Sequence, residues 1–376
     1  MTKGGLEDVV AANSAIADII GPQGKLTYRG IDIHDLARHS SFEETTYLLW
    51  FGSLPTREAL AEFSAELASH RALPPQVLTL MKDFPRNAAP MDALRTALSA
   101  LAFYDPQARD SSRDANVAKA MRVTAQTATI VGAYEQIRRG RQPIEPEETG
   151  SHAESFLRML FGAEPDPLYV RAMDLALILH ADHELNASTF AARVTAATLA
   201  DMYSAVVSAI GALAGPLHGG ANEQVMKMLQ KIGEPARVEA YVTERLEAHQ
   251  KISGFGHRVY RTEDPRATHL REMSRQLGEH VGNLRWYEIS RKVEEVVMQQ
   301  KHLYANVDFY SASCYFTMGI PIDMFTPVFA VSRISGWTAH ILEQYADNRL
   351  IRPRAEYVGL KDVPYLPIDR RVRAAS

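Results

Sequence analysis

The chain has 376 residues, of which 46% are hydrophobic and 23% are charged, enough to bury a large core in one or two domains. Lys and Arg number 41 against 45 Asp and Glu, and this near balance (formal net charge −4) excludes the basic footprint of a nucleic-acid-binding protein. The single cysteine, Cys314, excludes an internal disulfide framework and a thiolate zinc cluster, and it favours a reducing, cytoplasmic setting.

Targeting and membrane signals are weak. Residues 1–8 (MTKGGLED) have no apolar run, which predicts no signal peptide. The longest notable uncharged stretch, 202–222, gathers glycines and a proline at one end, unlike a membrane span. We therefore expect no membrane association.

The first predicted elements are a hairpin arm and a capped helix. Residues 21–24 (GPQG) form a turn signal, and residues 25–31 alternate well enough for one short strand. Ser41 and Glu44 have the spacing of a capping box before an apolar run, which predicts a helix start. The polar, proline-containing segments 105–116 and 139–148 are expected to be surface loops.

Helical patterns fill the rest of the chain. Residues 168–180 are apolar almost all round and predict a buried helix, and 191–214 predict another that stops at Gly215-Pro216. Apolar residues at helical spacing also occur at 289, 293, 296 and 297. No series of strand–helix units is visible, so the predicted fold class is all-α.

Two histidines lie beside glycines, where backbone can approach a ligand closely. His218 lies in residues 215–223 (GPLHGGANE), just after a helix breaker. His257 lies in residues 253–261 (SGFGHRVYR) and is followed by Arg258, Arg261 and Arg266, whose guanidinium groups suit carboxylates or phosphates. The alternatives are a glycine-rich helix connection and a solvated basic turn.

Asp308 is the lone acid of an otherwise uncharged run, 302–322. Desolvation there would raise its pKa toward that of a useful base. A buried aspartate that caps a helix would give the same pattern.

Other chemistries fit less well. His180 and His183 could offer two metal ligands on one helical face, but no third ligand is evident. Gly254-x-Gly256 is too short for a dinucleotide fingerprint, and no Walker A or nucleophile-elbow pattern occurs. Two histidines, one aspartate and several arginines suit proton removal next to a carbonyl of an anionic substrate.

The same segments carry a family resemblance. Residues 215–223, 254–261 with 264–266 (DPR), and 306–311 (NVDFYS) closely resemble the three signature blocks of citrate synthases, in family order. Residues 24–33, 41–45, 179–189 and 329–337 resemble further blocks, so the similarity covers nearly the whole chain.

The resemblance implies a helical fold with a large and a small domain around a cleft: 1–217 and 325–376 in the large domain, 218–324 in the small one. It implies a homodimer with a shared active site. We expect a cytoplasmic protein whose cleft closes on oxaloacetate. The implied reaction, which belongs to the tricarboxylic acid cycle, condenses acetyl-CoA with oxaloacetate and hydrolyses citryl-CoA.

Roles follow residue by residue from this resemblance. Asp308 would take a proton from the thioester methyl, His218 would bind the thioester oxygen, and His257 would polarise the oxaloacetate ketone. The oxaloacetate carboxylates would be held by His183, Arg266, Arg333 and, from the other subunit, Arg352. Coenzyme A would contact Ile252, Gly254, Gly256 and Arg261, with help from Lys251 or Lys301. No metal or cofactor is implied, because the thioester is a substrate.

Two alternatives remain. A 2-methylcitrate synthase shares all these blocks and accepts propionyl-CoA, and a non-catalytic helical scaffold or sensor would keep the fold. The chain is shorter than family members that have an extra N-terminal domain and NADH inhibition, so we expect no such regulation. The match of Arg352 depends on the proline that follows it, with Arg349 and Arg354 close by.

Overall fold

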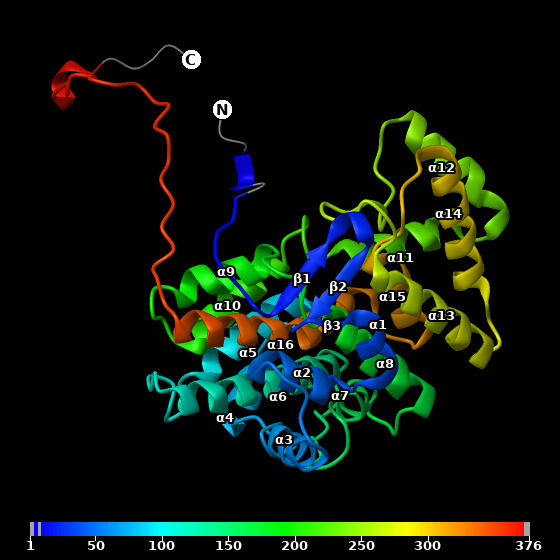
Figure 1. The fold of residues 1–376 in the computed structure, drawn as a ribbon, viewed down its shortest axis with the longest axis horizontal. Coiled ribbons are helices and arrows are strands. Elements are labelled where there is room, and N and C mark those ends of the chain that lie inside the picture. The colour runs from blue at the N-terminus through cyan, green and yellow to red at the C-terminus, as the bar shows by residue number, and fades with distance from the viewer. Residues whose placement is uncertain (1–3, 7–8, 372–376) are drawn as a thin grey trace.

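The computed structural model describes residues 4–6 and 9–371, and helices dominate it (Figure 1). Of residues 1–8, on which the signal-peptide prediction depends, 1–3 and 7–8 lie outside this description. The α-helices of the described chain are α1 Ile33–His39, α2 Phe42–Phe51, α3 Arg57–Ser69, α4 Pro75–Lys82, α5 Pro90–Leu101, α6 Arg113–Arg138, α7 His152–Phe161, α8 Pro167–His180, α9 Ala187–Ala196, α10 Met202–Leu213, α11 Ala221–Ile232, α12 Val238–Glu247, α13 Pro265–His280, α14 Arg285–Lys301, α15 Val307–Thr317 and α16 Phe325–Ala346. The all-α prediction is confirmed.

One small antiparallel sheet, in the order β1-β2-β3, lies near the N-terminus. Its strands are β1 Ala17–Ile20, β2 Lys25–Tyr28 and β3 Ile31–Asp32. The predicted turn at 21–24 is present, but the single strand predicted over 25–31 is wrong, because Arg29 and Gly30 have left-handed backbones (φ 50° and 84°) and turn the chain back. The register pairs Ala17 with Tyr28 and Ile20 with Lys25. The β1–β2 turn contacts the loop before α13: the backbone N–H of Arg261 donates a hydrogen bond to the Gly21 carbonyl at 3.2 Å.

Helix α16 runs through the centre of the core. It packs against α2, α6, α8, α9 and α10, and Figure 1 shows it crossing between these helices. Its side chains are buried almost continuously from Phe325 to Ile341. Burial on all sides explains why this helix can hold a charged residue, Arg333, at a fixed place inside the protein.

Helices α11 to α15 pack mainly on one another, at one end of the molecule in Figure 1. Helix α13 also touches α1 and α8. At the first of these contacts, Nδ1 of His34 lies 2.8 Å from Nε2 of His269. His218 lies just before α11, His257 lies in the connection between α12 and α13, and Asp308 lies at the start of α15.

The predicted single helix over 191–214 is wrong. Helix α9 ends at Ala196, Leu199 has a left-handed backbone (φ 63°), and α10 begins at Met202. Asp201 is the reason, because its carboxylate accepts a hydrogen bond from the backbone N–H of Ser204 at 2.9 Å and caps a new helix. The loop predicted over 105–116 is also shorter than expected, since Ser112 caps α6.

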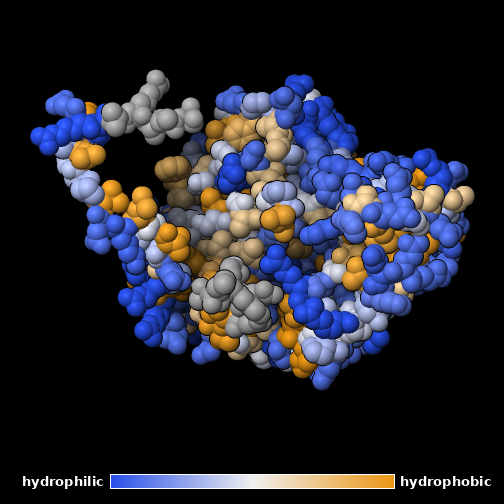
Figure 2. All heavy atoms as spheres, turned by 90° about the horizontal axis from the view of Figure 1, so that it is seen from above, coloured by the Kyte–Doolittle hydropathy of each residue, from blue (hydrophilic) through white to orange (hydrophobic). Residues whose placement is uncertain are grey.

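Residues 347–371 leave the end of α16 as an extended, largely exposed segment (Figures 1 and 2). Asp347 and residues 349–353 still line a cavity on the body of the protein, and the rest of the segment stands away from it. Several of its apolar side chains are exposed, namely Leu350, Tyr357, Val358, Leu360, Val363, Tyr365, Leu366 and Ile368. None of the described helices combines the length and the apolar character needed to cross a bilayer.

Candidate active site

Predicted site residues lie on six separated segments, and all but the one that carries Arg352 contribute to one site. His183 follows α8, His218 lies between α10 and α11, and His257 lies between α12 and α13. Asp308 is the second residue of α15, and Arg333 lies inside α16. The fold brings them together: the rings of His183 and His257 are 5.1 Å apart, and the charge of Arg333 acts on both His218 and Asp308.

Asp308 is an aspartate with an unusually high pKa. Burial raises its pKa to about 6, although the positive charge of Arg266 works in the opposite direction. Asn306 fixes the start of its helix by accepting the backbone N–H of Asp308 at 3.1 Å. No described residue donates a hydrogen bond to the Asp308 carboxylate. The group is thus a carboxylate at neutral pH that can accept a proton.

The tautomer of His218 is assigned from its backbone hydrogen bond. Its Nε2 accepts the backbone N–H of Ser188 at 3.3 Å and lies 2.8 Å from the Ser188 hydroxyl oxygen. Trp337 holds that hydroxyl in place through its indole N–H, at 3.1 Å. Burial, assisted by the charge of Arg333, lowers the pKa of His218 to about 4. His218 is therefore a neutral imidazole with its hydrogen on Nδ1.

His257 has the opposite tautomer. Its Nδ1 accepts the backbone N–H groups of Val259 and Tyr260 at 3.0 and 3.1 Å. Burial, and then the charge of Arg266, lower its pKa to about 4. The neutral ring therefore carries its hydrogen on Nε2, from where it can donate to a substrate oxygen.

His183 lies in contact with a residue that sequence reasoning missed. Its Nε2 lies 3.2 Å from the hydroxyl oxygen of Tyr260, whose ring packs on His257 with a centroid distance of 4.6 Å. Burial, followed by the charges of Arg266 and His257, lowers the pKa of His183 well below its ordinary value. The only sequence signal for Tyr260 is its position three residues after His257.

Arg266 forms a buried ion pair with Asp264. Its Nε and Nη2 donate to the two carboxylate oxygens at 2.9 and 2.8 Å. The same carboxylate accepts the backbone N–H of Val307 at 3.1 Å, so it ties the start of α13 to the start of α15. Although burial works against the charge, the Asp264 carboxylate raises the pKa of Arg266, so Arg266 stays charged.

Arg333 is the second buried cation of the site. Its Nε donates to the His180 carbonyl at 2.6 Å, and its guanidinium lies 4.7 Å from the centre of the Phe329 ring. Burial lowers its pKa to about 10, with Asp182 opposing, so Arg333 is charged at neutral pH. Arg266 and Arg333 together suit a substrate with two carboxylates.

Two of the predicted coenzyme A residues, Gly254 and Gly256, lie in a loop that contacts the start of α15. Gly254 and Gly256 have φ of 81° and 80°, which glycine adopts without strain. The Gly254 carbonyl accepts the backbone N–H of Asn306 at 2.9 Å, so this loop is joined to the start of α15. Ile252 is buried and Arg261 exposed. Lys251 and Lys301 are exposed as well.

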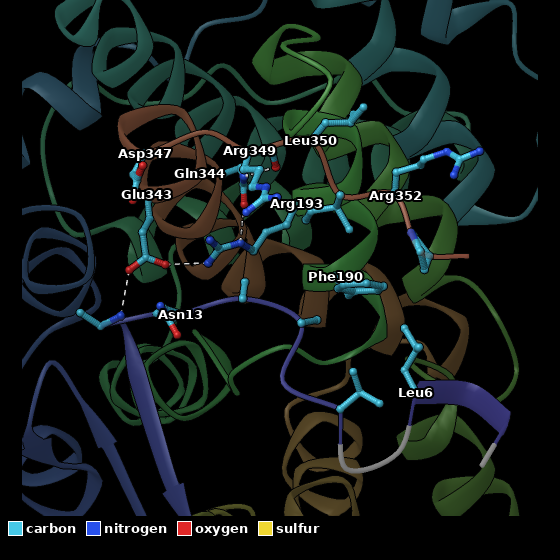
Figure 3. A pocket seen from close by; sticks show the side chains of 17 residues that line it. Leu6, Asn13, Phe190, Arg193, Glu343, Gln344, Asp347, Arg349, Leu350 and Arg352 are labelled. Atoms are coloured by element: carbon cyan, nitrogen blue, oxygen red, sulfur yellow. Dashed lines mark hydrogen bonds and ion pairs between the residues drawn. The ribbon is translucent and has the colours of Figure 1, made fainter. Parts of the chain in front are cut away.

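Arg352 is not in contact with the other predicted oxaloacetate residues of its own chain. It lies on the exposed C-terminal segment and lines a different cavity of about 940 Å³ together with Arg193, Glu343 and Arg349 (Figure 3). Arg193 and Glu343 form an ion pair at 2.6 Å on one side of that cavity. Within one chain, the site therefore has two of its three predicted oxaloacetate arginines.

The possible histidine pair for a metal does not form on one helix face. Helix α8 ends at His180, whose Nδ1 lies 2.8 Å from the Ala176 carbonyl inside the core. His183 lies beyond the end of that helix and faces Tyr260 instead. The two rings therefore have separate partners.

Comparisons with known proteins show the family of the chain. The family described as "Citrate synthase, C-terminal domain" matches residues 5–354. The chain is 52% identical to citrate synthase 2 of Bacillus subtilis (98% of each chain covered), 51% to citrate synthase of Haloferax volcanii (98% and 99%), and 40% to 2-methylcitrate synthase of Shewanella oneidensis (99% and 98%).

Solved structures are similar over the full length. Citrate synthase of Pyrobaculum aerophilum superposes with a TM-score of 0.92 at 41% identity, covering 98% of this chain and 95% of that one. Citrate synthase of Thermoplasma acidophilum, solved as a ternary complex with carboxymethyl coenzyme A and oxaloacetate, has a TM-score of 0.91 at 34% identity and 98% coverage of both.

Proposed function

The chain belongs to the citrate synthase family and is an enzyme that condenses acetyl-CoA with oxaloacetate, and we propose that Asp308, His218 and His257 perform the chemistry. The observation that carries this proposal is that the three groups differ in protonation state and in the atoms that they offer to a substrate. One is a carboxylate with a raised pKa, and two are neutral imidazoles that present different ring nitrogens.

In the first step, Asp308 accepts a proton from the methyl carbon of acetyl-CoA. The electrons move onto the thioester oxygen, and Nδ1–H of His218 stabilises that oxygen as the enol or enolate forms. A neutral imidazole suits this task because an imidazolium would be costly in a buried site that already holds two arginines.

In the second step, the enolate carbon attacks the ketone carbon of oxaloacetate. Nε2–H of His257 polarises the ketone and protonates the new alkoxide, giving citryl-CoA. His183, Arg266 and Arg333 hold the oxaloacetate carboxylates. Water then cleaves the thioester to citrate and coenzyme A, so coenzyme A enters as part of a substrate and no further cofactor takes part.

We also propose that the active unit is a homodimer with shared sites, in which the partner supplies Arg352. Two facts support this: Arg352 lies apart from the site of its own chain, and the segment that carries it is extended and exposes many apolar side chains. Such a segment gains stability when it packs on a second copy. The single buried cysteine supports a cytoplasmic location.

Domain closure is part of the same proposal. Helices α11–α15 would form the small domain over 218–324 and move against the rest, because an enolate must be protected from water. Oxaloacetate, held by residues of both domains, would favour the closed form. Small-angle scattering and thioester affinity, each with and without oxaloacetate, test this. An unchanged radius of gyration and an unchanged affinity would contradict it.

The experiment for the reaction is an assay of free thiol released from acetyl-CoA and oxaloacetate, repeated with propionyl-CoA. We expect a higher kcat/KM for acetyl-CoA, because the relatives with 46–52% identity are citrate synthases and the 2-methylcitrate synthases are more distant. The absence of thiol release would refute the catalytic assignment. A higher kcat/KM for propionyl-CoA would make the chain a 2-methylcitrate synthase.

A further inference from the structure

Tyr260 contacts histidines from two different segments of the site, and the proposed mechanism does not use it. Its hydroxyl oxygen lies 3.2 Å from Nε2 of His183, and its ring lies 4.6 Å from that of His257 at an interplanar angle of 40°. The residue is 3% exposed. Its own backbone N–H donates to Nδ1 of His257, so Tyr260 contacts this histidine through both backbone and ring.

The protons of this contact can be assigned. Burial raises the pKa of Tyr260 above its ordinary value, so the phenol keeps its hydrogen at neutral pH. Burial also lowers the pKa of His183, so that imidazole is neutral and has one N–H. Within the described chain, the Tyr260 hydroxyl has no hydrogen-bond partner other than His183.

Only one arrangement gives the phenol O–H an acceptor. If Nε2 of His183 carried the hydrogen, the phenol O–H would be buried without an acceptor, which costs free energy. If the phenol donates to Nε2, the hydrogen of His183 is on Nδ1. The hydroxyl therefore selects the tautomer of His183 as well as its ring orientation.

We propose that Tyr260 is a positioning residue for oxaloacetate: its hydroxyl fixes His183 so that Nδ1–H is the donor offered to a substrate carboxylate, and its ring supports His257. The inference rests on the proposed function, since it assumes that His183 binds oxaloacetate. It makes Tyr260 a residue that acts through two histidines, with no bond of its own to the substrate.

Two substitutions distinguish the effect of the Tyr260 hydroxyl from the effect of its ring. Tyr260→Phe keeps the ring on His257 and removes only the hydrogen bond to His183. We expect it to weaken oxaloacetate binding about tenfold, with kcat at saturating substrates within about threefold of wild type. Tyr260→Leu also removes the ring, so kcat should fall as well. Calorimetry with oxaloacetate alone gives the dissociation constant, and the thiol assay gives kcat and KM.

Tyr134→Phe is the matched control. This tyrosine in α6 donates its hydroxyl to the Ala88 carbonyl at 2.9 Å, far along the chain from the site residues. It should lower the thermal midpoint as Tyr260→Phe does while leaving oxaloacetate affinity unchanged.

Wild-type affinity in Tyr260→Phe, or equal weakening in Tyr134→Phe, would overturn the proposal for Tyr260. The proposed function fails in a different way, through a wild-type enzyme that releases no thiol. Calorimetry on oxaloacetate does not depend on turnover, so the two failures are distinguishable.

Discussion

The backbone N–H of Ser188 donates a hydrogen bond to Nε2 of His218 across 3.3 Å. A ring nitrogen that accepts a hydrogen bond cannot also carry a hydrogen, so this contact assigns the N–H of the neutral ring to Nδ1. In His257 the two backbone donors meet Nδ1 instead, which assigns the N–H to Nε2. The two catalytic imidazoles therefore differ in the nitrogen that they offer.

This difference predicts opposite orders of activity for amide substitutions. The amide nitrogen of Asn occupies the place of Nδ1, and that of Gln occupies the place of Nε2. His218→Asn should therefore retain more turnover than His218→Gln, whereas His257→Gln should retain more than His257→Asn. Each mismatched variant loses a donor to a developing oxyanion and should lose a further ~10²–10³-fold in kcat. If the same amide, Asn or Gln, retained more turnover at both positions, the assigned tautomers of His218 and His257 would be wrong.

The raised pKa of Asp308 predicts the acid limb of the pH profile. A general base must be deprotonated, so kcat/KM should fall as the pH drops through about 6, the pKa of this carboxyl. Burial lowers the pKa of His218 and His257 to about 4, so neither should titrate in this range. Initial rates between pH 5 and 8 are the measurement, and a flat profile across about pH 6 would argue against Asp308 as the base.

Gly336 predicts a stability effect at the site. A Cβ there would lie 2.2 Å from the Ala181 carbonyl oxygen and 2.6 Å from Oδ1 of Asp182, directly before His183. Gly336→Ala should therefore destabilise the protein by ~1–3 kcal/mol, as overpacking does. Gly211→Ala in α10 is the control, since nothing lies within 4 Å of its Cβ position, and it should be neutral or stabilising by ~0.4–1 kcal/mol. The denaturant midpoint of each variant is the measurement. Equal changes of the midpoint in Gly336→Ala and Gly211→Ala would contradict the close contact between Gly336 and the Ala181 carbonyl.

Much of the fold could be predicted because the local patterns are strong. The apolar run of 168–180 became α8, and Ser41 caps α2 by accepting the backbone N–H of Glu44 at 3.2 Å. The break between α9 and α10 escaped prediction because alanine-rich sequence favours helix on both sides. The N-terminal cap made by Asp201 fixes the start of α10, and a single aspartate gives little signal within the alanine-rich residues 191–214.

In the site, too, the residues with a local sequence signal could be predicted, and most of their long-range contacts could not. His218, His257 and Asp308 could be selected from their local surroundings, because glycines and an uncharged run mark them. The two donors to His257 lie within three residues of it, but the partners of His218 and His183 could not be predicted, since Ser188 is 30 residues from His218 and Tyr260 is 77 residues from His183. Such contacts depend on tertiary packing, which periodicity and spacing do not report.

The shared site predicts recovery of activity on mixing two inactive proteins. Asp308→Asn removes the base, and Arg352→Ala removes the residue proposed to come from the partner. In a mixed dimer, one site would hold both lesions and the other would hold neither, so partial activity should return. The thiol assay on subunits exchanged under mild denaturation is the measurement. No recovery, with exchange shown by mass spectrometry, would count against the shared site.

The central claim is that Asp308 removes the proton from the thioester methyl, and turnover of Asp308→Asn tests it most directly. Asparagine keeps the shape of the side chain but cannot accept the proton. We predict that kcat for thiol release falls by at least ~10²–10⁴-fold, while calorimetry shows oxaloacetate binding close to wild type. A variant that binds oxaloacetate normally and keeps more than about a tenth of wild-type turnover would show that another group is the base.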